Sequence, residues 1–177
     1  NSFLLDKLGK NVLGEKLTIK DTPHAPGFMG SRWFDSEGIA TKEMEIVSEG
    51  VPQLYFLNSY FANKLNTTPT IESVSVPTIN PFGASDAASM MKEIGSGILI
   101  TGFNGGNCNG ASGDFSFGIE GYLFKDGVIL HPIKEMNMTG NILYLWKNVT
   151  NIGTDYRKCS RWLIPSIAFE NVDLSGK

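Results

Sequence analysis

The residues from Gly102 to Gly110 are the part of this sequence that looks most like a ligand-binding loop. They read Gly-Phe-Asn-Gly-Gly-Asn-Cys-Asn-Gly, and glycine N–H groups in such a run can surround an anion. The run lacks the Gly-Lys-Ser/Thr ending of a Walker loop and the Gly-x-Gly-x-x-Gly of a dinucleotide site. The residues after it, Ser112–Phe124, alternate like a strand, whereas both sites require a helix N-terminus. We therefore expect a wide structural loop, in which Gly105 and Gly106 permit positive φ and close backbone approach.

The other side chains that could do chemistry do not form a catalytic or metal-binding pattern. His24 and His131 are far apart in the sequence, and no His-Glu-x-x-His, Cys-x-x-Cys or Gly-x-Ser-x-Gly motif occurs. Asp114 is expected to be either a turn cap or a buried carboxylate that orients the glycine-rich loop. Cys108 and Cys159 are expected to be reduced thiols, with a single disulfide as the alternative. We expect no complete catalytic site within this chain.

The composition is that of a soluble globular domain. The 177 residues are 41% hydrophobic and 19% charged, and no apolar run approaches the length of a membrane span. The formal net charge of −3, with Lys and Arg scattered singly, argues against direct nucleic-acid binding. No signal peptide is apparent and the chain does not begin with Met, so we expect one domain of a longer protein.

The first half of the sequence predicts short strands around a long irregular segment. Ser2–Leu8 is expected to be a short helix, and Leu17–Asp21 a strand. Residues 22–38 carry two prolines and several glycines and predict a loop. Thr41–Ser48 and Val51–Leu57 predict a hairpin, Tyr60–Leu65 a helix capped by Ser59, and Ile71–Val76 another strand followed by an extended proline-containing stretch.

The second half predicts longer hairpins. Ala87–Ile94 is expected to be a helix between an Asp86 cap and Gly95, and it precedes a buried strand at Gly97–Thr101. Asp126-Gly127 is the strongest turn signal, joining Ser112–Phe124 to a returning strand at Val128–His131. A helix is expected over Gly140–Val149 with Thr139 as its cap, and one or two strands over Trp162–Leu174. The fold class is therefore α+β, mainly antiparallel hairpins in a partly closed, barrel-like sheet, with three or four short helices.

An ordered series of motifs resembles the C-terminal domain of the TldD/TldE (PmbA) family. The main one is Gly-Gly-x-x-x-Gly-x-Ser-Gly-Asp-Phe-Ser-x-Gly-x-x-Gly from Gly105 to Gly121, followed by Asp126-Gly127. Weaker matches are Asp21-Thr22-Pro23, the irregular segment from Gly30 to Gly38, Thr139-Gly140-Asn141-Ile142-Leu143 and Ile152-Gly153-Thr154-Asp155. The matches span essentially the whole chain, as one C-terminal domain over residues 1–177. Thr154 departs from the pattern, because the family usually has Asn there.

The resemblance implies a subunit of a cytosolic heteromeric zinc metallopeptidase. In that family the D-type subunit carries a His-Glu-x-x-x-His zinc helix and a cysteine, and the metal activates water for amide hydrolysis. This chain has no such helix, and the residues around Cys159 do not match the D-type pattern, so Cys159 is only a weak metal candidate. The resemblance therefore favours the non-catalytic, E-type (PmbA-like) subunit, with zinc carried by a TldD-like partner.

The expected role of such a subunit is to help hold unfolded peptide substrates. An extended peptide can add to an exposed strand edge through backbone hydrogen bonds. The candidate binding or loop residues are Gly105, Gly106, Asp114, Ser116 and Asn141. The alternative is a regulatory or interaction protein, since family members have been named modulators of DNA gyrase. A homodimer of this domain is also left open.

Overall fold

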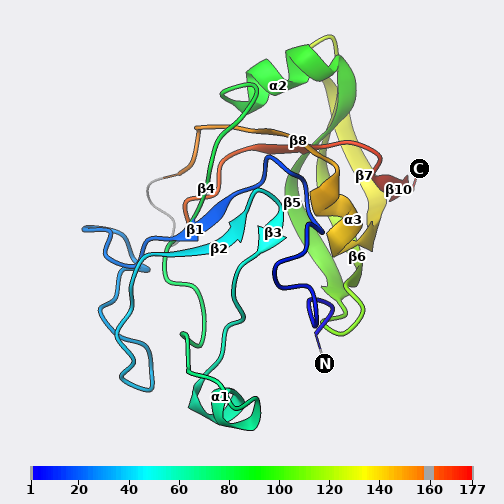
Figure 1. The fold of residues 1–177 in the computed structure, drawn as a ribbon. Coiled ribbons are helices and arrows are strands. Elements are labelled where there is room, and N and C mark those ends of the chain that lie inside the picture. Colours follow the sequence, from blue (N-terminus) through cyan, green and yellow to red (C-terminus); the bar gives the residue numbers. More distant parts are fainter. Residues whose placement is uncertain (1, 158–161, 177) are drawn as a thin grey trace. The chain divides into compact units, whose positions relative to one another are not determined.

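The computed structural model describes residues 2–157 and 162–176, which form two compact units. One unit comprises Asn1–Asp6, Pro81–Asp155 and Ser166–Lys177, and we call it the hairpin unit. The other comprises Lys7–Asn80 and Tyr156–Pro165, and we call it the loop unit. Each unit contains a four-stranded antiparallel sheet (Figure 1). The predicted α+β class, dominated by antiparallel pairing, is confirmed.

The sheet of the loop unit has the strand order β3-β2-β1-β4. Its strands are β1 (Ile19–Asp21), β2 (Met44–Ser48), β3 (Val51–Pro52) and β4 (Pro77–Ile79). The β2–β3 hairpin is confirmed, with Glu49 and Gly50 at positive φ in the turn, but its returning strand ends at Pro52. The predicted strand at Ile71–Val76 is wrong. The N–H groups of Ser75 and Val76 donate to the Asp21 side chain instead of to a neighbouring strand, and pairing begins only at Pro77.

Of three local predictions at the start of the chain and in the loop unit, one is wrong and two are confirmed. The helix expected at Ser2–Leu8 is wrong: these residues form successive turns, and Asp6 has a positive φ of 59°, which a right-handed helix excludes. The helix α1 (Ser59–Lys64) is confirmed, although its cap is Asn58, whose side chain accepts the Phe61 N–H. Residues 22–40 are irregular apart from an isolated bridge between Phe34 and Ala40, as the prolines and glycines predict.

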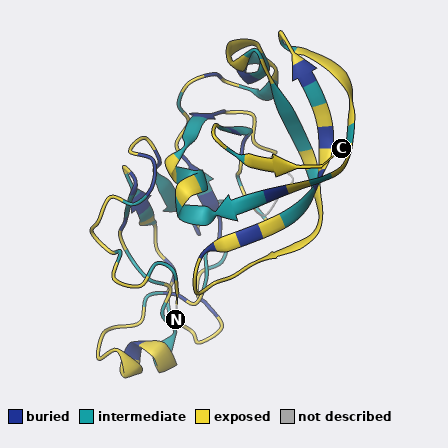
Figure 2. Ribbon diagram, turned by 90° about the vertical axis from the view of Figure 1, so that its right-hand side faces the viewer, coloured by how far each residue is buried: buried dark blue, intermediate teal, exposed yellow. Residues whose placement is uncertain are grey.

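The sheet of the hairpin unit has the order β10-β7-β6-β5. Its strands are β5 (Ser96–Cys108), β6 (Asp114–Lys125), β7 (Val128–Asn141) and β10 (Asp173–Ser175). Asp126 and Gly127 both have positive φ, 53° and 76°, which confirms the predicted tight turn between β6 and β7. The alternation of buried and exposed residues along the strands is visible in Figure 2 as dark-blue stretches between yellow ones. One face buries Phe115, Ile119 and Met138 in a common core.

The remaining elements of the hairpin unit are α2 (Ala87–Ile94), α3 (Ile142–Lys147), β8 (Val149–Ile152) and β9 (Ile167–Phe169). The helix α2 is confirmed with both of its predicted ends, because the Asp86 side chain accepts the Ser89 N–H and Gly95 has φ 84°. The helix α3 is shorter than predicted, and its N-cap is Asn141 rather than Thr139. The expected partial barrel is wrong. Over the described ranges the strands form three separate sheets, the third being the β8–β9 pair, and none of them closes into a barrel.

Candidate functional site

The glycine-rich segment is mostly strand, not the wide loop expected from its composition. β5 runs through it to Cys108 and pairs with β6, with register shifts between Ile100 and Gly102 and between Phe103 and Gly106. These shifts are β-bulges, which insert extra residues on one strand and bend it. The sequence pattern could not reveal them, because a bulge is defined by the partner strand as much as by its own residues.

Glycines make the close packing of β5 on β6 feasible. A Cβ atom on Gly106 would fall onto the Ser116 carbonyl oxygen and lie 2.7 Å from the Phe117 Cα. A Cβ on Gly118 would fall onto the Asn104 carbonyl oxygen. Close backbone approach, predicted for this run, is therefore confirmed. Gly105 differs, because a Cβ there would meet nothing within 4 Å, and only its φ of 75° favours glycine.

The loop proper is the five-residue tip that joins β5 to β6. The Asn109 side-chain oxygen accepts the N–H groups of Ala111 and Ser112, at 2.9 and 3.4 Å. The Gly113 N–H closes the turn on the Asn109 carbonyl at 2.7 Å. Asn109 thus bonds its own backbone as short amide side chains commonly do, and the tip has a defined conformation.

Asp114 and Asn141, two of the predicted site residues, come together at the base of this tip. They are directly opposite in the β6–β7 register, and the Asn141 amide donates to Asp114 Oδ1 at 2.9 Å and to the Ser112 carbonyl at 3.0 Å. The Asn141 Oδ1 caps α3 by accepting the Leu143 N–H. Asp114 is exposed, so it is not the buried carboxylate that we considered. The Asn141 amide and then the Ser112 hydroxyl lower the pKa of Asp114 by stabilising its charged form.

Replacing Asn141 with alanine is expected to raise the pKa of Asp114 towards its ordinary value, because the strongest donor to the carboxylate is lost. The lowered pKa means that Asp114 stabilises the fold above the ordinary aspartate pKa of about 3.9, and that this contribution disappears as the pH falls through the folded-state pKa. A carboxyl NMR titration measures the shift directly. Asn137→Ala, an exposed asparagine on the same strand, is the control, and an equal shift there would contradict the assignment.

The remaining predicted residues lie on exposed surface beside this cluster. Ser116 is two residues along β6, paired with Asn107 and Thr139, and Gly105 lies exposed in the β5 bulge. Further along the sheet is an open pocket of about 470 Å³, where Asn104 donates to Glu120 at 2.8 Å. These groups offer hydrogen-bond donors and acceptors, but they do not pair a nucleophile with a base.

Metal-binding side chains do not converge in residues 2–157 and 162–176, where no three His, Cys, Asp or Glu form a group that could hold an ion. His24 contacts Thr41 Oγ1 at 3.2 Å, and His131 is exposed beside the Pro132 carbonyl. Cys108 is an exposed free thiol at the end of β5. The weak metal candidate Cys159 lies outside the described residues. The described part of the chain therefore offers no donor set that fits a catalytic zinc.

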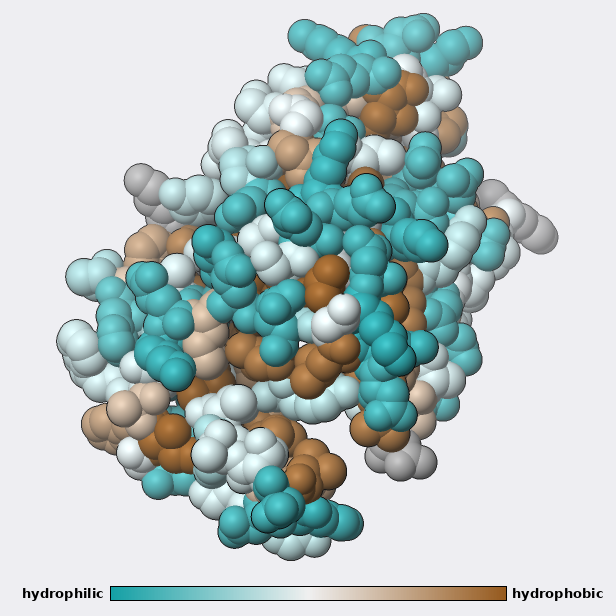
Figure 3. Space-filling view, in the orientation of Figure 1, coloured by the Kyte–Doolittle hydropathy of each residue, from teal (hydrophilic) through white to brown (hydrophobic). Residues whose placement is uncertain are grey.

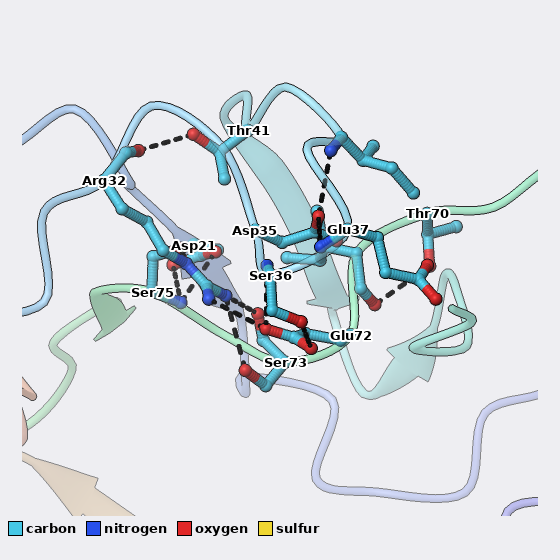
Figure 4. A network of polar contacts seen from close by, with 12 residues as sticks. Asp21, Arg32, Asp35, Ser36, Glu37, Thr41, Thr70, Glu72, Ser73 and Ser75 are labelled. Carbon is cyan, nitrogen blue, oxygen red and sulfur yellow. Dashed lines mark hydrogen bonds and ion pairs between the residues drawn. The ribbon is translucent and has the colours of Figure 1, made fainter. Parts of the chain in front are cut away.

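The loop unit contains a network of polar side chains that was not predicted from the sequence (Figure 4). Asp21 and the segment around Asp35 were noted only as parts of the family-like motifs. Its centre is Asp21, which is fully buried and accepts the N–H of Ser75 at 3.0 Å and that of Val76 at 2.7 Å. Arg32 donates to Ser75 Oγ at 2.9 Å and pairs with Glu72 at 3.4 Å. The sequence indicated this network only through charged residues in a segment that is otherwise rich in turns. The network anchors residues 22–41.

No helix in the described ranges combines the length and apolar character needed to cross a bilayer.

Comparison with known proteins agrees with the motifs. Residues 1–176 match the sequence model of the PmbA/TldA metallopeptidase C-terminal domain. The chain is 31% identical to the metalloprotease PmbA of Escherichia coli O157:H7 over 178 residues, covering 100% of this chain and 40% of that protein. It is 32% identical to a Haemophilus influenzae PmbA homologue, covering 99% of this chain and again 40% of the relative. The chain thus spans about two-fifths of the length of these relatives.

Solved structures show the same fold. A candidate modulator of DNA gyrase from Bacteroides thetaiotaomicron superposes with a TM-score of 0.94 at 44% identity, over 100% of this chain and 40% of that one. TldE from Thermococcus kodakarensis superposes with a TM-score of 0.85 at 22% identity, over 98% of this chain and 42% of that one, and shows the shared fold. The match of residues 1–176 to the family model, together with 31% identity to a PmbA over the whole chain, shows that this chain belongs to the PmbA/TldA metallopeptidase family, as its C-terminal domain.

Proposed function

We propose that this chain is the C-terminal domain of a non-catalytic, E-type subunit in a cytoplasmic heteromeric zinc metallopeptidase that acts on unfolded peptides. In this proposal a TldD-like subunit supplies the zinc, and the present chain helps to hold the substrate. The observation that carries the proposal is the free edge of β5 in the hairpin unit.

β5 is well suited to pair with an extended peptide. It is 13 residues long, and in the described topology it has a strand neighbour, β6, on one side only. Such an edge presents unpaired N–H and C=O groups, which bind an added strand with little dependence on its sequence. Residues 103–108 are exposed, and the space beside Gly105 is open, because a Cβ there would meet nothing within 4 Å.

The donor chemistry supports the assignment to a non-catalytic subunit. The 177 residues contain no His-Glu-x-x-x-His sequence, and the described residues bring no three metal-binding side chains together. A hydrolytic zinc needs about three protein ligands and an open position for water. In this proposal the ligands come from the TldD-like partner subunit.

The test measures cleavage of an unstructured fluorogenic peptide by the full-length protein alone, by a TldD-like subunit alone, and by both together with zinc. We expect cleavage only with both, and loss of it on adding a chelator. Gly105→Asn in the pair is expected to lower cleavage by about tenfold, because the side chain obstructs the edge while Asn tolerates positive φ. Gly110→Ala is the control, since a Cβ there meets nothing within 4 Å.

Two outcomes count against the proposal. Chelator-sensitive cleavage by the full-length protein without a partner would rule out a non-catalytic role. Full activity of the Gly105→Asn pair would rule out peptide binding at the β5 edge.

The second candidate function is regulation of DNA gyrase, which is favoured by the description of two similar solved structures as candidate modulators of that enzyme. It requires association with gyrase in the absence of any peptidase partner. A pull-down of purified gyrase by the full-length protein alone distinguishes this function from the first.

A further inference from the structure

Hydrophilic side chains make up much of the molecular surface, but β5 carries no charge. On the face drawn in Figure 3, hydrophobic side chains (brown) form separate groups among hydrophilic ones (teal). The 13 residues of β5 include no Asp, Glu, Lys or Arg. Charged side chains commonly protect an edge strand from pairing, and β5 lacks that protection. Within this sheet, the charges nearest to a strand that pairs with β5 therefore lie on β6.

Glu120 of β6 holds its carboxylate above β5. It lies directly opposite Gly102 in the β5–β6 register, and a Cβ atom on Gly102 would be 3.6 Å from Glu120 Oε2. The Asn104 amide donates to the other oxygen, Oε1, at 2.8 Å, which orients the carboxylate. Gly102 places no side chain between Oε2 and the free edge of β5. The charge of Glu120 is therefore open to a group that approaches from that edge.

The Glu120 carboxylate lines the open pocket of about 470 Å³ on this sheet. Asn104 and Tyr122 form other parts of its wall, and Lys134 and Glu135 of β7 complete it. Among the described residues, no ion pair includes either of these carboxylates or the Lys134 amine. Two carboxylates against one amine give the pocket a net negative charge. Its volume is ample for one long side chain.

We propose that this pocket binds a Lys or Arg side chain of a peptide paired with β5, with Glu120 as the specificity-determining residue. The inference rests on the proposed function, because it needs a peptide at the β5 edge. In such pairing the backbone bonds supply affinity and side-chain pockets supply specificity. Directly opposite residues of paired strands have Cβ atoms about 4.5–5.5 Å apart on the same face. The peptide residue opposite Gly102 therefore directs its side chain across the glycine towards Glu120.

The length and charge of the side chain decide what reaches this carboxylate. A short side chain opposite Gly102 ends above the glycine. The methylene stem of Lys or Arg spans the glycine and brings a cation to Oε2. A peptide carboxylate in the same place would meet the negative charge of the pocket.

Peptide affinity, measured by fluorescence anisotropy on the full-length protein, tests the inference. One labelled, unstructured and otherwise neutral peptide carries a single central Lys. Its partner carries norleucine there, which keeps the apolar stem without the charge. At low ionic strength we expect the Lys peptide to bind about threefold to fivefold more tightly, as for a partly exposed ion pair.

Three variants and a matched control locate the effect. Glu120→Gln removes the charge and Gly102→Val fills the space above the glycine, so each is expected to abolish the preference for Lys. Valine suits a strand, and its Cβ would make only an ordinary contact at 3.6 Å. Glu120→Lys is expected to favour a Glu peptide over the Lys peptide. The control is Asp173→Asn, which removes the same charge from β10, at the opposite edge of this sheet, and should keep the preference.

Equal affinity of the wild type for the Lys and norleucine peptides would overturn the proposal. So would a preference that Glu120→Gln or Gly102→Val leaves intact, or one that Asp173→Asn removes equally. Failure of the proposed function gives a different result, because then neither peptide binds, and the basic-side-chain pocket falls with it. Binding of both peptides without preference rejects the pocket alone and leaves the peptide-holding role in place.

Discussion

Gly106→Ala is expected to lower the free energy of unfolding of the hairpin unit by about 3–5 kcal/mol. Two effects add at this position. The residue has φ 100°, which L-amino acids rarely adopt, and the new Cβ would overlap the Ser116 carbonyl while lying 2.7 Å from the Phe117 Cα. The obstructing atoms are backbone, so relief requires β5 and β6 to separate. Urea unfolding measures the loss, and amide exchange should show that protection falls first in these two strands.

Gly110→Ala is the control for this experiment, because it lies four residues away at the hairpin tip. Its added Cβ would meet nothing within 4 Å and its φ is not in the left-handed region, so we expect a change within about 0.5 kcal/mol. If Gly106→Ala were equally mild, the close approach of the two strands would not be what requires glycine here. A change in peptide binding by Gly106→Ala would also be hard to interpret without this stability measurement.

Features set by neighbouring residues could be predicted from the sequence. The turn at Asp126-Gly127 could be predicted because it needs two consecutive positive φ angles, which these two residue types tolerate. The ends of α2 could be predicted because Asp86 and Gly95 are the residue types that cap helices. The alternation of β6 likewise follows from its period of two. In each case the deciding interactions are formed within a few residues.

Features set by distant partners could not be predicted. The β5 bulges exist because Gly106 and Gly118 let two backbones approach, and the spacing of the glycines does not reveal which residue lies opposite. Ile71–Val76 has a strand-like composition, yet the Asp21 side chain, more than 50 residues earlier in the chain, takes the N–H groups that a strand would need. The Asp114–Asn141 contact similarly joins residues 27 positions apart. The family motif contained both residues but not their contact.

Asp21→Ala is expected to destabilise the loop unit by about 3–5 kcal/mol, because it leaves two buried N–H groups without acceptors. Both side-chain oxygens of Asp21 lie 3.0 Å from the Ser75 nitrogen, and Oδ1 lies 2.7 Å from that of Val76. Asp21 and Ser75 are both fully buried, so water cannot replace the lost acceptor. Chemical unfolding of the full-length protein, followed by amide exchange at Ser75 and Val76, measures the effect.

Glu45→Ala is the matched control, because it removes a carboxylate from the neighbouring strand of the same sheet. Glu45 pairs with Lys20 at 3.1 Å, but both side chains are more than 40% exposed, so we expect no resolvable change in the free energy of unfolding. Asp21→Asn should fall between the two, since an oxygen at the Oδ1 position can still accept both N–H groups while the NH₂ group at the Oδ2 position faces the Ser75 N–H. If Asp21→Ala matched Glu45→Ala, the network in Figure 4 would not hold the segment 22–41 in place.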